Sequence, residues 1–146
     1  MVALEVWFDQ VPDNDFSPGD PAIIVENLND LDRLIDHVLQ ATEEREIPPV
    51  IQASIADTPG LPIVEAGFDR DFGFISYTDR TGGFYSVGDS SRTGEAIYDY
   101  MGNEHIVPAS TQIPLSMVRQ WLADFIDTGQ PSTRVPIARD DHYRQA

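Results

Sequence analysis

The feature that most constrains the fold of this chain is a succession of short β-prone runs between residues 50 and 107, separated by turn-forming residues. The runs span residues 50–55, 61–66, 72–77, 83–87, 95–100 and 105–107. The intervening stretches 57–60 and 78–83 place Gly60 and Gly82-Gly83 where hairpin turns require a positive φ. This pattern predicts an antiparallel meander.

An amphipathic helix is predicted before the meander, at about residues 29–45. The apolar positions recur at i, i+3, i+4, i+7 and i+8, which places them on one helical face; they are Leu31, Leu34, Ile35, Val38 and Leu39. Asn29 or Asp30 is a suitable N-cap, because a short side-chain oxygen accepts a bond from an unpaired backbone N–H. Pro48-Pro49 prevents the helix from continuing.

A second helix is predicted after the meander, at about residues 114–128. Its apolar residues again follow helical spacing; they are Met117, Val118, Trp121, Leu122, Phe125 and Ile126. Ser110 and Thr111 offer caps, Pro114 suits a first turn, and Gly129 supplies a C-terminal stop. At this period, Trp121 and Phe125 are expected in the core.

The remaining segments complete a single α+β domain over residues 1–146. Residues 2–8 are predicted to form a strand, and residues 133–137 an edge strand where Pro136 is tolerated. Both faces of the run 72–77 carry apolar residues, which is typical of a central strand covered on both sides. We therefore expect an antiparallel sheet of about six to eight strands with two main helices, and a frayed tail at 139–146.

The charge of the chain restricts its partners. The sequence has 25 acidic residues against nine basic ones, all arginine, and a net charge of −16. Direct binding to nucleic acid or an anionic membrane is disfavoured, because both depend on Lys and Arg. A partner with a basic surface is the natural complement. The first 60 residues carry a net −11 and the rest −5, so charges before Gly60 are expected to contribute more to partner capture.

Cysteine and histidine content argues against metal and cofactor chemistry. The absence of cysteine excludes disulfides and thiol nucleophiles, and the three histidines, His37, His105 and His142, are not at metal-ligand spacing. We predict no metal and no cofactor. The first ten residues do not resemble a secretory signal and no apolar run reaches about 20 residues, so a cytoplasmic protein is expected.

One short motif resembles a catalytic block. Residues 88–91 read Gly-Asp-Ser-Ser, similar to the nucleophile block of the Gly-Asp-Ser-Leu esterases. In that family the block lies near the chain start and ends in Leu, and an Asp-x-x-His follows near the C-terminus. Here the block lies in the meander, where turn chemistry favours a hairpin turn. A small serine hydrolase using Ser90 or Ser91 therefore stays a distant alternative.

Taken as an ordered string, the C-terminal half resembles the Imm-one immunity proteins, which are common in actinobacteria and protect a cell from its own polymorphic toxin. The resemblance rests on the order and spacing of runs that begin at Phe72-Gly-Phe-Ile-Ser-Tyr77 and Phe84-Tyr-Ser-Val-Gly88. The further runs are Tyr98-Asp-Tyr100-Met-Gly102, Val107-Pro108, Ile113-Pro114 and Phe125-Ile-Asp-Thr128-Gly129-Gln-Pro131. One departure is Val135-Pro-Ile137, since the family often has Trp after this Val.

The resemblance implies an α+β fold without catalytic residues that binds one toxin domain and occludes it, often a nucleic-acid deaminase. An acidic inhibitor suits a toxin whose basic cleft binds phosphates. Our hypothesis for the contact surface combines aromatic anchors with carboxylates: Trp7, Tyr85, Asp9, Asp13, Asp15, Asp20, Asp32, Asp36, Glu43 and Glu44. The main alternative is an acidic adaptor or complex subunit.

Overall fold

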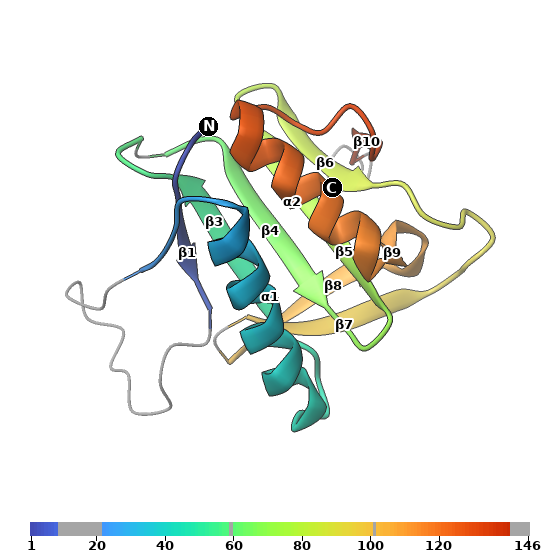
Figure 1. Ribbon diagram of the computed structural model, residues 1–146. Helices are drawn as coiled ribbons and strands as arrows, with labels where there is room; N and C mark the ends of the chain where they lie inside the picture. The colour runs from blue at the N-terminus through green and yellow to red at the C-terminus, as the bar shows by residue number, and fades with distance from the viewer. Residues whose placement is uncertain (9–21, 59, 101, 141–146) are drawn as a thin grey trace.

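The computed structural model describes residues 1–8, 22–58, 60–100 and 102–140 (Figure 1). The strands are β1 (Leu4–Trp7), β2 (Ile23–Val25), β3 (Val50–Ile55), β4 (Ile63–Phe68), β5 (Phe72–Asp79), β6 (Gly82–Ser86), β7 (Glu95–Tyr100), β8 (Asn103–Pro108), β9 (Ile113–Pro114) and β10 (Ile137–Arg139). The helices are α1 (Leu28–Glu43), the 3-10 helix η1 (Ala109–Thr111) and α2 (Leu115–Thr128). The predicted α+β class is confirmed.

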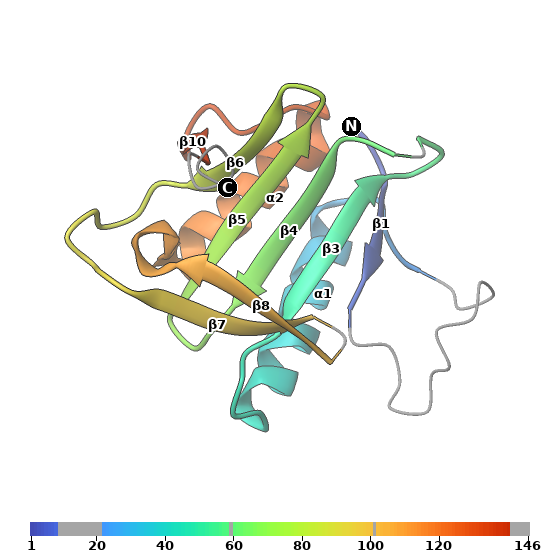
Figure 2. The same ribbon diagram turned by 180° about the vertical axis from the view of Figure 1, so that it is seen from behind.

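Eight strands form the main antiparallel sheet, in the order β10-β6-β5-β4-β3-β1-β2, with β9 paired to β5. Strands β3 to β6 are consecutive neighbours and form the predicted meander. The two main helices cover one face of this sheet, and the β7–β8 hairpin crosses the other (Figure 2). We refer to these as the helix face and the hairpin face.

Strand β5 is covered on both faces, as its composition predicts. Ile75 and Tyr77 belong to the core beneath the helices, and Phe74 belongs to a smaller core beneath the hairpin. Trp121 and Phe125 of α2 stack with ring centroids 5.3 Å apart, and both are fully buried against the helix face. Burial of such large apolar side chains is the main stabilising contribution to this layer.

Helix α1 begins at Leu28, one residue before the predicted start. The predicted N-cap at Asn29 or Asp30 is wrong, because the Asn27 side chain accepts a hydrogen bond from the Asp30 backbone N–H at 2.8 Å. The Asp30 carboxylate accepts one in turn from the Glu26 N–H at 3.1 Å. This exchange satisfies N–H groups of the first turn and extends the helix past the apolar pattern.

Helix α2 matches the prediction at its C-terminus and differs at its N-terminus. Gly129 ends it with a positive φ of 73°. Ser110 and Thr111 were expected to cap it, but both lie in η1, and the Thr111 hydroxyl donates to the Pro108 carbonyl instead. The chain enters α2 through Pro114, with no side-chain cap. The two-residue strand β9 separates η1 from the helix.

The β7–β8 hairpin does not continue the meander, contrary to the sequence pattern. It forms a two-stranded sheet of its own and packs its inner side chains, Tyr98 and Val107, on the hairpin face. Before the hairpin, the backbone at Gly88 passes so close to the backbone of Gln112 that a Cβ at residue 88 would collide with the Gln112 carbonyl. Ser86 fixes the same approach, because its hydroxyl donates to Thr111 and accepts from the Ile75 N–H.

The edges of the main sheet are short strands. Strand β2 has three residues and was not predicted, because so short a run carries no periodicity. The predicted edge strand at 133–137 forms only from Ile137, after Pro136, and pairs with β6. Arg139 ends this strand and Asp140 is buried, so the first two residues of the predicted tail are ordered. Residues 141–146 lie outside the described part.

Candidate functional site

The predicted contact residues do not form one surface. Asp9, Asp13, Asp15 and Asp20 lie outside the described residues. Asp32, Asp36 and Glu43 lie in α1 on the helix face, and Glu44 is the C-cap of this helix. Tyr85 and Trp7 belong to the hairpin face. The main sheet therefore separates the α1 carboxylates from the aromatic candidates.

Only part of the α1 acidic set is available to a partner. Asp36, Glu43 and Glu44 are exposed. Asp32 accepts two hydrogen bonds from the Arg119 guanidinium, at 2.6 and 3.1 Å, and so links α1 to α2. These bonds from Arg119 lower the pKa of the Asp32 carboxyl. Asp32 therefore has a structural contact within the chain.

Trp7 and Tyr85 lie at the ends of one cross-strand row on the hairpin face. Register pairs connect the row from strand to strand, in the order Trp7, Gln52, Glu65, Ser76 and Tyr85. Four strand spacings of about 4.8 Å separate the two aromatics by about 19 Å. Both are half-buried, while the neighbouring Phe8 is buried in the helix-face core.

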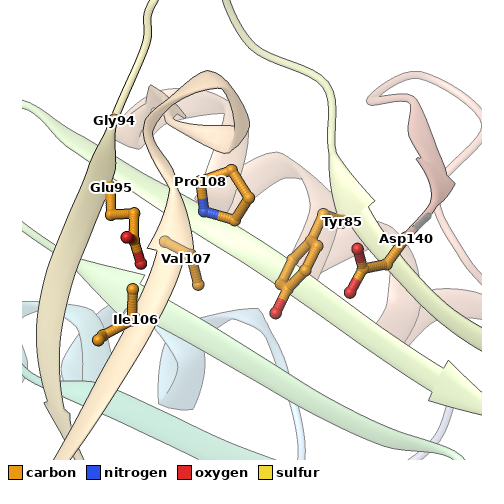
Figure 3. Close-up of a pocket in the computed structure, with 7 residues that line it drawn as sticks. All are labelled: Tyr85, Gly94, Glu95, Ile106, Val107, Pro108 and Asp140. Carbon is orange, nitrogen blue, oxygen red and sulfur yellow. The ribbon is translucent and has the colours of Figure 1, made fainter. Parts of the chain in front are cut away.

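A groove lies between Tyr85 and the hairpin (Figure 3). Its volume is about 460 Å³, and it is lined by Tyr85, Gly94, Glu95, Ile106, Val107, Pro108 and Asp140. The side chains of Tyr85 and Asp140 lie beside each other on one wall, and Glu95 lies on the hairpin side. The Asp140 N–H donates to the Gly83 carbonyl at 2.9 Å, which fixes this acid at the groove.

The outer side of the hairpin is apolar next to this groove. Ile97 and Ile106 are direct cross-strand partners, and their side chains are 48% and 44% exposed. Along the same outer side of the hairpin, Glu95 lies two residues before Ile97. The cross-strand pair Asp99 and Glu104 lies two positions beyond the isoleucines. The hairpin therefore presents an apolar pair between carboxylates. We call Tyr85, Glu95, Ile97, Ile106 and Asp140 the groove surface.

The hairpin is held in place by tight packing on its inner side. The ring of Tyr98 packs edge-on against Phe74, with centroids 4.9 Å apart, and its hydroxyl accepts a bond from the Gln112 amide at 3.0 Å. Burial raises the pKa of Tyr98 to about 12. Tyr85 also packs edge-on against Phe74, at 6.4 Å, so the groove wall and the hairpin share one buried ring.

An acid–histidine pair lies beside this small core. The His105 imidazole stacks on Phe74, and its Nδ1 is 3.8 Å from a Glu65 carboxylate oxygen. Burial raises the pKa of Glu65, and the nearby His105 acts in the opposite direction. This pair links β8 of the hairpin to β4 of the main sheet.

Ser90 and Ser91 are not arranged as a catalytic nucleophile would be. The Ser91 hydroxyl donates to the Asp89 carboxylate at 2.6 Å, within a local turn. Ser90 lines a smaller hollow beyond Tyr85, whose described lining residues include no histidine. Within the described residues, no group of three His, Asp or Glu side chains is placed to hold a metal ion. No described helix is long and apolar enough to cross a membrane.

Four residues of the groove surface were not singled out from the sequence: Glu95, Ile97, Ile106 and Asp140. A signal for Ile97 was present, because the alternation along β7 places Ala96, Tyr98 and Tyr100 on one side and leaves Ile97 among acids. An apolar residue on the polar side of a strand is a candidate contact residue. The sequence around Asp140 carries no such signal, because this residue is buried only when β10 pairs with β6.

Comparison with known proteins identifies the family of this chain. No curated protein matches the sequence. Among solved structures, a hypothetical protein from Neisseria gonorrhoeae is similar, with 11% identity, a TM-score of 0.44 and coverage of 90% of each chain. The family described as Immunity protein Imm1 matches residues 19–138, which is most of the sequence. This chain therefore belongs to the Imm1 (Imm-one) family of immunity proteins.

Proposed function

We propose that this protein acts in the cytoplasm as a non-enzymatic inhibitor, which binds and neutralises a cognate polymorphic toxin that acts on nucleic acid, such as a deaminase. The Imm1 family supports a role in toxin immunity. The observation that carries the finer proposal is the net charge of −16, with Asp36, Glu43 and Glu44 exposed on α1 and its C-cap. An acidic protein of this kind is complementary to the basic cleft that such a toxin needs.

The charge provides two physical advantages to an inhibitor. Carboxylates placed over a basic cleft compete with the phosphates of the substrate, so binding and occlusion coincide. Long-range attraction between opposite charges also raises the association rate well above the typical 10⁵–10⁷ M⁻¹s⁻¹. Rapid capture protects the cell because each free toxin molecule is harmful.

The separation of the two candidate surfaces suggests a division of work between them. Exposed acids of α1 lie on the opposite side of the main sheet from the groove, so one flat partner surface does not cover both. We assign the α1 acids to attraction at a distance, which needs no contact. Close contact is assigned to the hairpin face, where aromatic side chains are available. Trp7 and Tyr85 remain the candidate anchors there.

The test is neutralisation of the toxin domain encoded immediately upstream of this chain. The purified chain is titrated into that domain during turnover of its nucleic-acid substrate, and we expect inhibition that is complete near one equivalent. Co-expression should also restore growth to cells that produce the toxin. A neighbour that binds the chain but is not toxic would instead identify an adaptor or complex subunit. Absence of both binding and rescue would refute the immunity role.

A further inference from the structure

We infer that the groove surface is the docking site for an arginine side chain of the toxin, presented beside an apolar residue that packs on Ile97 and Ile106. This inference rests on the proposed function and adds to it the place of contact and the chemistry of the partner. It concerns the hairpin face, whereas the sequence directed attention to the acids of the first 60 residues.

The exposed isoleucine pair is the first observation. Ile97 and Ile106 lie opposite each other on the outer side of the hairpin, and close to half of each side chain is in water. Burying this pair against a partner would remove apolar area from water, which favours association. Scattered exposed apolar residues are common, but here two are cross-strand neighbours, and one of them, Ile106, lines the groove.

The charge of the groove is the second observation. Among its described lining residues, Glu95 presents an exposed carboxylate on the hairpin side of the groove. Arg139, at the end of β10, directs its guanidinium elsewhere, over the Phe84 ring at 4.9 Å and toward the Thr81 carbonyl at 2.6 Å.

The aromatic wall selects arginine. A guanidinium is planar and weakly hydrated, so it stacks on a ring such as Tyr85 while it donates paired hydrogen bonds to a carboxylate. Its alkyl stem packs on apolar surface such as Ile106 and Pro108. The volume of about 460 Å³ is sufficient for such a side chain and lies at the small end of the range for binding pockets.

The test measures the kinetics of binding between the full chain and a catalytically inactive form of the upstream-encoded toxin domain. The variants are Glu95→Gln, Ile106→Thr and Tyr85→Ala, and the matched controls are Glu26→Gln and Ile24→Thr, which change exposed residues on other elements. Circular dichroism checks that each variant is folded. We expect each groove variant to dissociate at least tenfold faster, with the controls within twofold of the unchanged chain.

A double-mutant cycle identifies the partner residue. Each surface arginine of the toxin domain is changed to alanine and combined with Glu95→Gln. One arginine should show a coupling of at least tenfold in affinity, and the others none. If the unchanged chain binds and inhibits but the groove variants dissociate at its rate, the docking inference is wrong and the proposed function stands. If the unchanged chain does not bind, both fail.

A second copy of this chain is the competing occupant of the surface. Sedimentation of the free chain decides between the two. A monomer that stays monomeric in Ile106→Thr agrees with our inference, whereas a dimer that this substitution dissociates would overturn it.

Discussion

The ring of Tyr98 lies directly against Gly67, so that a Cβ added to Gly67 would be 2.7 Å from the ring and closer still to Phe74. This contact joins the hairpin to the main sheet, because Tyr98 belongs to β7 and Gly67 to β4. Both rings are fully buried. The absence of a side chain at residue 67 is therefore what allows the hairpin to lie on this face.

Replacing Gly67 with alanine should destabilise the protein by about 2 kcal/mol, because the methyl group overpacks two buried rings. Urea unfolding monitored by circular dichroism measures the change, and the near-ultraviolet signal should report the displaced tyrosine. Ser54→Ala, on an uncovered part of the same face, is the control and should change stability by less than about 0.5 kcal/mol. Equal effects from both would contradict this account of the hairpin contact.

Replacing Glu65 with glutamine should stabilise the protein more as the pH rises. Burial raises the folded-state pKa of Glu65 above its ordinary 4.5. The stability that this group contributes to the folded state is therefore present at low pH and is lost as the pH rises through the folded pKa. We expect a gain of about 1 kcal/mol at pH 7.5 and a smaller one at pH 4.5.

Thermal unfolding of the Glu65 variant across this pH range measures the effect. Glu5→Gln, which changes a carboxylate of β1 on the same face of the main sheet, is the matched control and should give a smaller difference. A stability difference at Glu65 that is constant, or that shrinks toward pH 7.5, would show that burial of this carboxylate is not the cause.

Replacing Asp124 with asparagine should destabilise the protein at neutral pH and much less in acid. Hydrogen bonds from Arg134 lower the pKa of Asp124 to about 2, with help from Ser132 and Gln120. A lowered pKa gives stability that is present above the ordinary value of 3.8 and lost as the pH falls through about 2. Because Arg134 is well exposed, we expect only about 1 kcal/mol at pH 7.

Urea unfolding at pH 7 and at pH 2.5 measures this difference for Asp124→Asn. The matched control is Asp127→Asn, one turn along the exposed side of the same helix, which should have little effect at either pH. An Asp124 variant that loses the same stability at both pH values would argue against a role for its ionised form.

Replacing Asp36 and Glu43 together with Asn and Gln should slow capture of the toxin without changing its release. Their attraction acts at a distance, so we expect a three- to tenfold lower association rate at low salt. The difference should vanish near 1 M salt, where the Debye length is about 3 Å. The charge-matched control changes Asp71 and Asp127, beyond Gly60, and should have less effect. Equal effects from the two pairs would remove the special role of the first 60 residues.

The local patterns determined most of the fold. Period-two runs gave strands β3 and β7 at their observed bounds, and helical spacing located α1 and α2 to within two residues. These signals are local because each depends on which side of one strand or helix is apolar. Caps were less predictable, since several nearby residues offer a suitable oxygen and backbone geometry selects among them, as with Asn27 instead of Asn29.

The candidate site depended on long-range packing. The acids of α1 and the ring of Tyr85 are all visible in the sequence, but only the sheet places them on opposite sides. The groove combines Tyr85, Glu95 and Asp140 from three strand regions, and no spacing along the chain brings these three together.

The sequence by itself therefore determined most of the elements, the family and the acidic character of this protein. Only the tertiary structure decided that β7 and β8 cross the main sheet instead of extending it. The physical reason is the space over Gly67, which admits Tyr98 and buries it against Phe74. Such a contact joins residues 31 positions apart, and its energy depends on shape rather than on any local pattern.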